Sequence, residues 1–292
     1  MAKRLWLSSK SIRSQNSLWK KILITIVLLI GYIYWGTNAL EVNYFTLVDE
    51  EIPSEFSGMK IAHVSDLHNK DFGSAMIDKV AVEEPDLIAV TGDLIDSNFP
   101  DTAIALEAIE GLRAIAPVYY VTGNHEASRF DLFSELAVQM EAAGVMMMDN
   151  RTLTLEKNGQ SIHLIGLEDP NFINSALSFE EKYEQMHNKL TELSDPDSFQ
   201  ILLSHRPEEM ASYVDENINL VLSGHAHGGQ IRLPFIGALV APGQGFFPKY
   251  SIGSYVENET TMIVSRGLGN SGIPFRFMNR PEIIMITLET KE

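Results

Sequence analysis

Three successive units of this chain repeat one pattern, and no other feature limits the possible fold so strongly. In each unit a short apolar stretch rich in Val and Ile is followed by a polar loop and then by an amphipathic stretch. The apolar stretches are 60–64, 86–90 and 118–121, and helices are predicted at 74–84, 101–114 and 130–143. Buried strands that alternate with helices at this spacing indicate an α/β fold with parallel strands.

The second half of the chain is richer in predicted strands. Asn158-Gly159 between apolar stretches at 153–155 and 162–167 predicts a hairpin, because both residue types accept the backbone of a tight turn. A helix is predicted at 180–193, and further strands are predicted at 199–203, 220–222, 262–264 and 283–288. No low-complexity linker divides this part, so one domain over 59–292 is expected.

Each predicted strand of the first half is followed by side chains that can bind metals. Asp66 and His68 follow the first strand, Asp93 follows the second, and Asn124 and His125 follow the third. The same holds later in the chain for His205, His225 and His227. Because sites in α/β sheets form outside the carboxyl ends of the strands, these loops are expected to converge.

The types of these side chains limit the metals that they would bind. The chain has no cysteine, so carboxylate, imidazole and amide groups are the available ligands. The spacings Asp66-x-His68 and His225-x-His227 place both members of each pair on one side of an extended backbone. Mixed oxygen and nitrogen ligands suit Mn, Fe or Zn, whereas Ca and Mg prefer oxygen alone. Two divalent metal ions are therefore expected.

The ordered set of these motifs resembles that of the calcineurin-like metallophosphoesterases, over roughly residues 59–289. The motifs are Asp66-x-His68, Gly92-Asp93, Gly123-Asn124-His125-Glu126, His205 and Gly224-His225-x-His227. The basic N-terminus, the stretch HAHGGQ and the segment 267–282 further resemble the membrane-associated bacterial branch of the family. That branch includes YkuE-like and YaeI-like proteins and is similar to LpxG-type UDP-2,3-diacylglucosamine hydrolases.

This resemblance implies a four-layer α/β/β/α sandwich and the metal-dependent hydrolysis of a phosphodiester, phosphomonoester or pyrophosphate bond. It also implies two sets of ligands that share Asp93. One ion would be bound by Asp66, His68, Asp93 and His227, and the other by Asp93, Asn124, His205 and His225. His125 would assist the leaving group near the substrate, and its imidazole can do so because it titrates near neutral pH. Glu126 is expected to be structural.

The N-terminus predicts a membrane anchor. Residues 1–21 carry six basic side chains and no acidic one, and residues 22–40 form an uncharged run of 19 that is close to the length of a membrane-spanning helix. Tyr32, Tyr34 and Trp35 near its end, with Lys20 and Lys21 before it, predict a single pass through the cell membrane with the catalytic domain outside the cytoplasm. A cleaved signal peptide and a buried core helix are the alternatives. Residues 41–58 are expected to connect this anchor to the domain, and 42–58 is predicted to form a first strand and a loop with a turn at Pro53 and Ser54.

The charge of the chain bears on its partners. The net charge is −17, and removal of the six basic residues of 1–21 leaves −23 for the remainder. A protein with this much negative charge repels polyanions, which argues against a nucleic-acid partner. A lipid-linked or envelope substrate is expected because an anchor raises the local concentration of such molecules. The alternatives are a non-catalytic metal-binding scaffold with the same fold and, as the resemblance implies, a specific UDP-2,3-diacylglucosamine pyrophosphohydrolase.

A late loop holds apolar side chains between glycines and prolines. These residues are Phe235, Ile236, Phe246, Phe247 and Tyr250. They predict either an exposed loop that meets an acyl chain or the bilayer, or a flap buried over the core. The sequence leaves both interpretations open.

Overall fold

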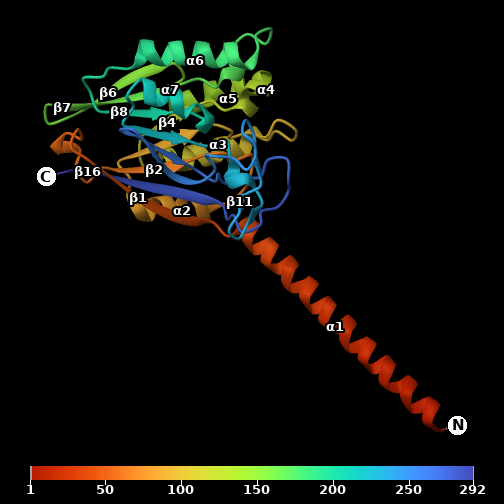
Figure 1. Ribbon diagram of the computed structural model, residues 1–292. Helices are drawn as coiled ribbons and strands as arrows, with labels where there is room; N and C mark the ends of the chain where they lie inside the picture. Colours follow the sequence, from red (N-terminus) through yellow and green to blue (C-terminus); the bar gives the residue numbers. More distant parts are fainter. Residues whose placement is uncertain (1, 292) are drawn as a thin grey trace.

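The computed structural model describes residues 2–291, with side chains from residue 17 onward, as one body from which a single long helix projects (Figure 1). The projecting helix is α1 (Ala2–Asn38), and two six-stranded mixed sheets form the centre of the body.

The first sheet has the strand order β1-β16-β2-β3-β4-β5. It contains β1 (Glu41–Asp49), β2 (Lys60–Val64), β3 (Leu87–Thr91), β4 (Val118–Val121), β5 (Met146–Met147) and β16 (Glu282–Thr290). Strands β2 to β5 are parallel, whereas β16 runs antiparallel to β2. β2, β3 and β4 are almost wholly buried, as the Val and Ile content of their sequences predicts.

The second sheet has the order β14-β15-β9-β8-β7-β6. It contains β6 (Arg151–Lys157), β7 (Gln160–Gly166), β8 (Gln200–Leu203), β9 (Leu220–Ser223), β14 (Gly253–Glu257) and β15 (Thr260–Val264). The predicted hairpin is present, because β6 pairs antiparallel with β7 around Asn158 and Gly159. β7, β8, β9 and β15 are parallel to one another.

Helices cover the outer faces of both sheets, so the order of layers is helix, sheet, sheet, helix (Figure 1). On the first sheet lie α2 (Ser74–Glu83), α3 (Thr102–Arg113) and α5 (Phe130–Ala142), and on the second α6 (Phe179–Leu193) and α7 (Met210–Asp215). The inner faces of the sheets pack against each other through side chains such as Ile61, Leu203 and Ile284. Burial of this apolar surface is the main driving force for folding.

Short elements connect these layers. They are α4 (Asn124–Ser128) and the 3-10 turns η1 (Ser54–Phe56), η2 (Pro170–Phe172), η3 (Pro207–Glu209) and η4 (His227–Gly229). Two small hairpins follow η4, namely β10 (Arg232–Leu233) with β11 (Gly237–Ala238) and β12 (Val240–Ala241) with β13 (Gly245–Phe246).

The structure corrects the expected start of the domain at residue 59, because the sheet already begins in the segment after the apolar run. Residues 41–58 do not only connect two parts of the chain, because Glu41–Asp49 pairs along its whole length with β16, and Ile52 and Phe56 are buried between the sheets. A strand is predicted within this segment, but its partner is not, because β16 lies more than 230 residues away. α1 also begins before the apolar run and includes the described part of the basic segment.

Over Ser17–Asn38, α1 is long and apolar enough to cross a membrane, and its most apolar stretch is not buried in the protein. Only the last turn, at Gly36 and Thr37, is covered by the body. A signal sequence would meet the same criteria of length and composition. The exposure of the span contradicts the alternative of a core helix.

Candidate dinuclear metal centre

All seven predicted ligands lie in loops at the carboxyl ends of strands, where the two sheets meet. Asp66 and His68 follow β2, Asp93 follows β3, Asn124 begins α4 after β4, His205 follows β8, and His225 and His227 follow β9. Six of the seven side chains are buried, and the amide oxygen of the seventh, Asn124, is also shielded from solvent. Parallel strands in both sheets therefore deliver these side chains to one place.

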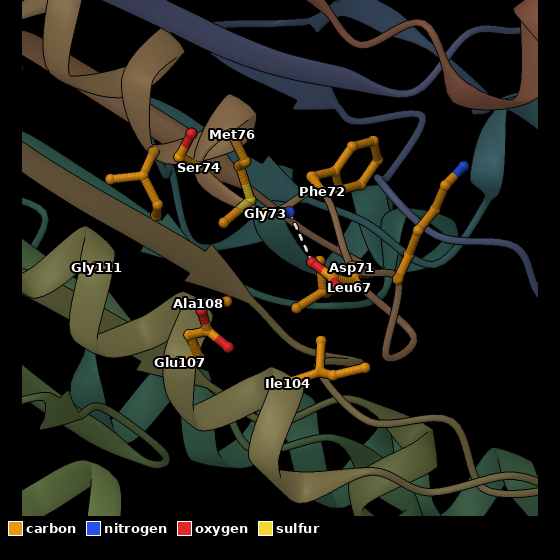
Figure 2. A pocket seen from close by; sticks show the side chains of 12 residues that line it. Leu67, Asp71, Phe72, Gly73, Ser74, Met76, Ile104, Glu107, Ala108 and Gly111 are labelled. Carbon is orange, nitrogen blue, oxygen red and sulfur yellow. Dashed lines mark hydrogen bonds between the residues drawn. The ribbon is translucent and has the colours of Figure 1, made fainter.

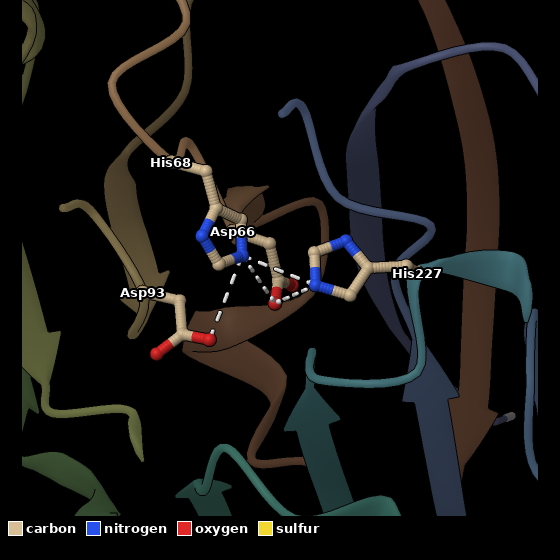
Figure 3. Close-up of side chains that lie close together, drawn as sticks. All are labelled: Asp66, His68, Asp93 and His227. Atoms are coloured by element: carbon tan, nitrogen blue, oxygen red, sulfur yellow. Dashed lines mark hydrogen bonds and ion pairs between the residues drawn. The ribbon is translucent and has the colours of Figure 1, made fainter. Parts of the chain in front are cut away.

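Four of these residues form the first cluster, which Figure 3 shows with the side chains turned toward one another. The Nε2 atom of His68 lies 3.1 Å from Nε2 of His227 and 3.6 Å from Oδ2 of Asp93. The Nε2 atom of His227 is 3.3 Å from Oδ1 of Asp66. Two imidazoles and two carboxylates thus share one buried space.

A second cluster is formed by Asp93, His205 and His225. The Oδ2 atom of Asp93 is 3.2 Å from Nε2 of His205. Asp93 therefore belongs to both clusters, and the same oxygen atom faces His68 and His205. Asn124 lies beside this second cluster, since it lines one cavity together with His225.

The hydrogen bonds around the clusters fit metal ligation. The Nδ1 atom of His205 is 2.7 Å from the carbonyl oxygen of Thr91, so this nitrogen carries the proton and Nε2 is free to bind an ion. The Nε2 atom of His205 and the Oδ1 atom of Asn124 are buried without a hydrogen-bond partner among the described residues. Unpaired buried polar atoms are costly, and a cation between them would remove that cost.

His68 has a similar arrangement. Its Nδ1 atom faces Oδ2 of Asp96 at 3.6 Å, while Nε2 points into the first cluster. A carboxylate behind a ligating histidine orients the ring and makes it a better ligand. Asp96 was not among the predicted site residues, because nothing in its local sequence marks it.

Five of the seven predicted ligands have a positive φ angle. These are Asp66 (53°), His68 (46°), Asp93 (54°), His225 (63°) and His227 (50°). Non-glycine residues rarely adopt this left-handed conformation, which costs on the order of 1–3 kcal/mol at each position and persists mainly at functional sites. The tertiary structure therefore holds these residues in a strained backbone conformation that turns their side chains toward one point.

Glycines beside the ligands allow the loops to approach closely. A Cβ atom at Gly123 would collide with the side chain of Asp93, and one at Gly224 would collide with Ser65 and Asp66. These two glycines of the sequence motifs are thus required by packing rather than by the φ angle.

The charges of the site are distributed unevenly. Burial holds the pKa values of His225 and His227 well below the usual range, which keeps both rings neutral. Burial also opposes the charged form of His205, but the carboxylate of Asp93 outweighs that effect and raises the pKa of His205 to about 10. Without a cation, a proton on His205 offsets the charge of Asp93.

His125 lies at the rim of the site. Its Nδ1 atom accepts a hydrogen bond of 2.9 Å from the backbone N–H of Ser97, so the proton of the neutral ring is on Nε2. That Nε2 atom lies 4.0 Å from Oδ2 of Asp93. Burial lowers the pKa of His125, which favours the neutral form.

Glu126 is structural, as expected. Its carboxylate accepts hydrogen bonds from the backbone N–H groups of Asp93, Ile95 and Gly123. It therefore ties together the two loops that carry Asp93 and Asn124.

The sequence did not predict a buried ion pair that supports the site. Arg206 donates to both carboxylate oxygens of Asp169, with Nε–Oδ2 at 2.6 Å and Nη2–Oδ1 at 2.9 Å. Its Nη1 atom lies 2.8 Å from Nε2 of His225. The one available signal was an arginine directly after His205 in a buried loop.

Two cavities differ in their relation to this site. One, of about 550 Å³, opens beside Asn124, Arg206 and His225. Another, of about 250 Å³, lies between α2, α3 and the loop that begins at Leu67 (Figure 2). None of the predicted ligands lines the second cavity. Of these two, the first is the one placed to receive a substrate.

The fold and the paired clusters define a metallophosphoesterase hydrolase with intact residues for a dimetal site. The chain belongs to the calcineurin-like phosphoesterases, whose family profile matches residues 59–229.

Two uncharacterized metallophosphoesterases of Bacillus subtilis are similar to it along most of their length. YkuE is 33% identical over 88% of this chain and 88% of its own, and YkoQ is 26% identical over 89% of this chain and 96% of its own. A Bos taurus protein, named transmembrane protein with metallophosphoesterase domain, is 32% identical over 82% of this chain and 54% of its own.

Proposed function

We propose that this chain is a membrane-anchored phosphoesterase that works with two divalent metal ions. One ion would be held by Asp66, His68, Asp93 and His227, and the other by Asp93, Asn124, His205 and His225. The observation that carries this proposal is the position of Asp93, whose Oδ2 atom lies within 3.6 Å of His68 and 3.2 Å of His205. One buried carboxylate is thus available to both ions.

The ions, when bound, supply the positive charge that attracts a phosphate ester and activates water for attack on phosphorus. Mn, Fe and Zn all suit this mixture of ligands, and manganese is our choice for the first assays. The residues of the chain hold the ions and shield them. Without residues 1–21 the chain has a net charge of −23, which repels a phosphate at long range, so the bound ions would supply most of the attraction.

His125 is proposed to act on the leaving group. Because Ser97 donates to its Nδ1 atom, the ring presents the N–H of Nε2 toward the site. That N–H can donate a hydrogen bond to the oxygen that leaves phosphorus and so neutralise part of its developing charge. His125 is therefore proposed as a catalytic residue.

The N-terminal helix is proposed to remain attached as a single-pass anchor over 22–40, with residues 1–21 in the cytoplasm and the domain outside it. Lys20 and Lys21 precede the apolar span, and Trp35 lies near its other end. The name of the bovine relative supports a membrane location. Since β1 is part of the first sheet, the catalytic domain is proposed to begin at Glu41.

The substrate is proposed to be a lipid-linked or envelope molecule with a phosphodiester, phosphomonoester or pyrophosphate bond. An anchor concentrates the enzyme near such molecules. The cavity beside Asn124 and His225, of about 550 Å³, has room for a headgroup.

The test uses the full chain in detergent micelles with Mn and bis-p-nitrophenyl phosphate. Asp93→Ala and His225→Ala are expected to lose nearly all turnover. His187→Ala is the matched control, because it removes an imidazole that pairs with Glu216 on the outer face of the second sheet. Equal turnover in all four proteins would refute the proposal.

A further inference from the structure

The anchor helix leaves the body at the edge that carries the metal ligands. β16 begins at Glu282 and runs antiparallel to β2, so its start lies at the carboxyl end of β2, next to the loop of Asp66 and His68. β1 is parallel to β16 and begins beside it, with Glu41 opposite Glu282. α1 therefore joins the body on the side of the site, not on the opposite side.

The end of α1 is packed directly on the body. The ring of Tyr32 meets that of Phe277 edge to face at 5.6 Å, and the backbone N–H of Arg276 donates to Oγ1 of Thr37 at 2.9 Å. The guanidinium of Arg280 lies 4.7 Å from the centre of the Trp35 ring. These contacts fix the direction in which α1 leaves.

Little chain separates the body from the apolar span. α1 ends at Asn38 and β1 begins at Glu41. The span Ser17–Asn38 has 22 residues and is about 33 Å long as a helix, close to the roughly 30 Å of a bilayer's hydrocarbon core. Because the span is barely longer than the core is thick, a helix that crosses the membrane here brings the edge with the site to the membrane surface.

Two hairpins stand at the same edge. The segment 231–247, called the hairpin pair here, follows η4 and contains β10 to β13. Its first residue, Ile231, forms a bridge with Phe277, the residue that also contacts Tyr32 of α1. Figure 1 shows β11 at the end of the body from which α1 departs.

The hairpin pair exposes large apolar side chains instead of burying them. Phe235 and Phe246 are 109% and 81% exposed, and Phe247 and Ile236 are 68% and 56% exposed. The prediction of a buried flap is therefore wrong for these four residues, although Tyr250 is buried. A cluster of large apolar side chains exposed to solvent marks a surface that contacts a membrane or a protein partner.

An apolar cavity connects the hairpin pair to the site. It has a volume of about 240 Å³ and is lined by His227, Gln230, Val240, Ala241 and Ile273, among others. One wall thus holds a proposed metal ligand, and another belongs to β12 of the hairpin pair.

We propose that the hairpin pair docks on the lipid surface beside α1, with Phe235 and Phe246 in the interfacial layer, so that the metal site receives its substrate from the bilayer. This inference rests on the proposed function, because it assumes that α1 spans the membrane. Aromatic rings favour the interfacial layer, and α1 holds the hairpin pair within reach of it.

The test uses the absence of cysteine from the chain. Single variants Phe235→Cys and Phe246→Cys of the full chain are labelled with the fluorophore NBD and reconstituted into phosphatidylcholine vesicles with some phosphatidylglycerol. Val82→Cys is the matched control, because Val82 is 79% exposed and lies near Lys60, at the opposite end of β2. A nitroxide on the lipid acyl chain, close to the headgroup, serves as the quencher.

The labels at 235 and 246 are expected to lose about half or more of their fluorescence, since docked groups lie roughly 5–10 Å deep in the interface, and the label at 82 should keep its signal. Equal quenching at all three positions would overturn the proposal. So would a cross-link between two chains at position 246 without quenching, because a second copy would then cover the hairpin pair.

Turnover of bis-p-nitrophenyl phosphate with Mn is measured on the same samples. Absence of quenching at positions 235 and 246, with normal turnover, would refute the proposed docking but not the proposed catalytic function. Quenching of the labels at 235 and 246, together with no turnover by the unlabelled wild-type chain in the same vesicles, would refute the proposed catalytic function and leave the docking intact.

Discussion

The buried pair of Arg206 and Asp169 offers a prediction whose size follows from the structure. The substitution Asp169→Asn keeps the shape of the side chain but removes its charge. Asp169 is 1% exposed and Arg206 is 5% exposed, and two hydrogen bonds join them. In the variant, the guanidinium, which stays charged at any ordinary pH, would face a neutral amide and keep Glu208, 3.5 Å from its Nη1 atom, as its remaining anionic neighbour.

Removal of one partner of a buried ion pair costs about 3–5 kcal/mol, and the lower value is expected here because Glu208 still faces the guanidinium. In a domain of this size, each kcal/mol lowers the melting temperature by about 2–4 °C. At about 3 kcal/mol, the expected loss of melting temperature is roughly 6–12 °C. Because Nη1 of Arg206 also contacts His225, the variant should in addition bind its second metal ion more weakly.

The assay is thermal unfolding of the full chain in detergent, followed by circular dichroism. The double variant Asp169→Leu with Arg206→Leu is the control, since it removes both charges and should recover much of the lost stability. A melting temperature for Asp169→Asn within about 3 °C of the wild type, equivalent to roughly 1 kcal/mol, would refute the reasoning.

Three further predictions address the metals, the glycine packing and the effect of pH. Chelation by EDTA should abolish turnover and lower the melting temperature by several degrees, because an ion at a hundred times its Kd stabilises the fold by about 2.7 kcal/mol. Added Mn should reverse both effects. An unchanged melting curve would contradict this prediction. Gly224→Ala should lower kcat on bis-p-nitrophenyl phosphate at least about tenfold, since its Cβ atom would displace Asp66, and kinetics at wild-type level would count against it. Burial raises the pKa of Asp149 from 3.8 to about 7. Its contribution to stability is therefore full below about pH 4 and is lost as the pH rises through 7, so Asp149→Asn should gain melting temperature over the wild type at about pH 8 but not at about pH 4. An equal difference at both values would exclude this origin.

Much of the fold could be predicted because the signals are local. The strands 60–64 and 118–121 have the predicted bounds, and the helix predicted at 74–84 is found at Ser74–Glu83. Apolar periodicity and turn residues define such elements without reference to distant parts of the chain. The convergence of the ligand loops followed from one rule, that sites form at the carboxyl ends of parallel strands.

The remaining features depend on contacts between distant residues. β1 pairs with β16 across almost the whole sequence, and Asp169 meets Arg206 at a separation of 37 positions. The left-handed backbone at Asp66 and Asp93 is likewise imposed by tertiary structure, since neither residue type nor spacing requires it. The sequence also allowed two environments for the hairpin pair, and the backbone bridge between Ile231 and Phe277 places it at the edge of α1.

The carboxylate of Asp93 is proposed to serve both metal ions. The most direct test is the number of Mn ions per chain, measured by elemental analysis after dialysis of the wild type, Asp93→Ala and His205→Ala. We expect about two ions in the wild type, about one in His205→Ala, where the ligands of the first cluster remain, and about none in Asp93→Ala. Two ions in Asp93→Ala would contradict the proposal.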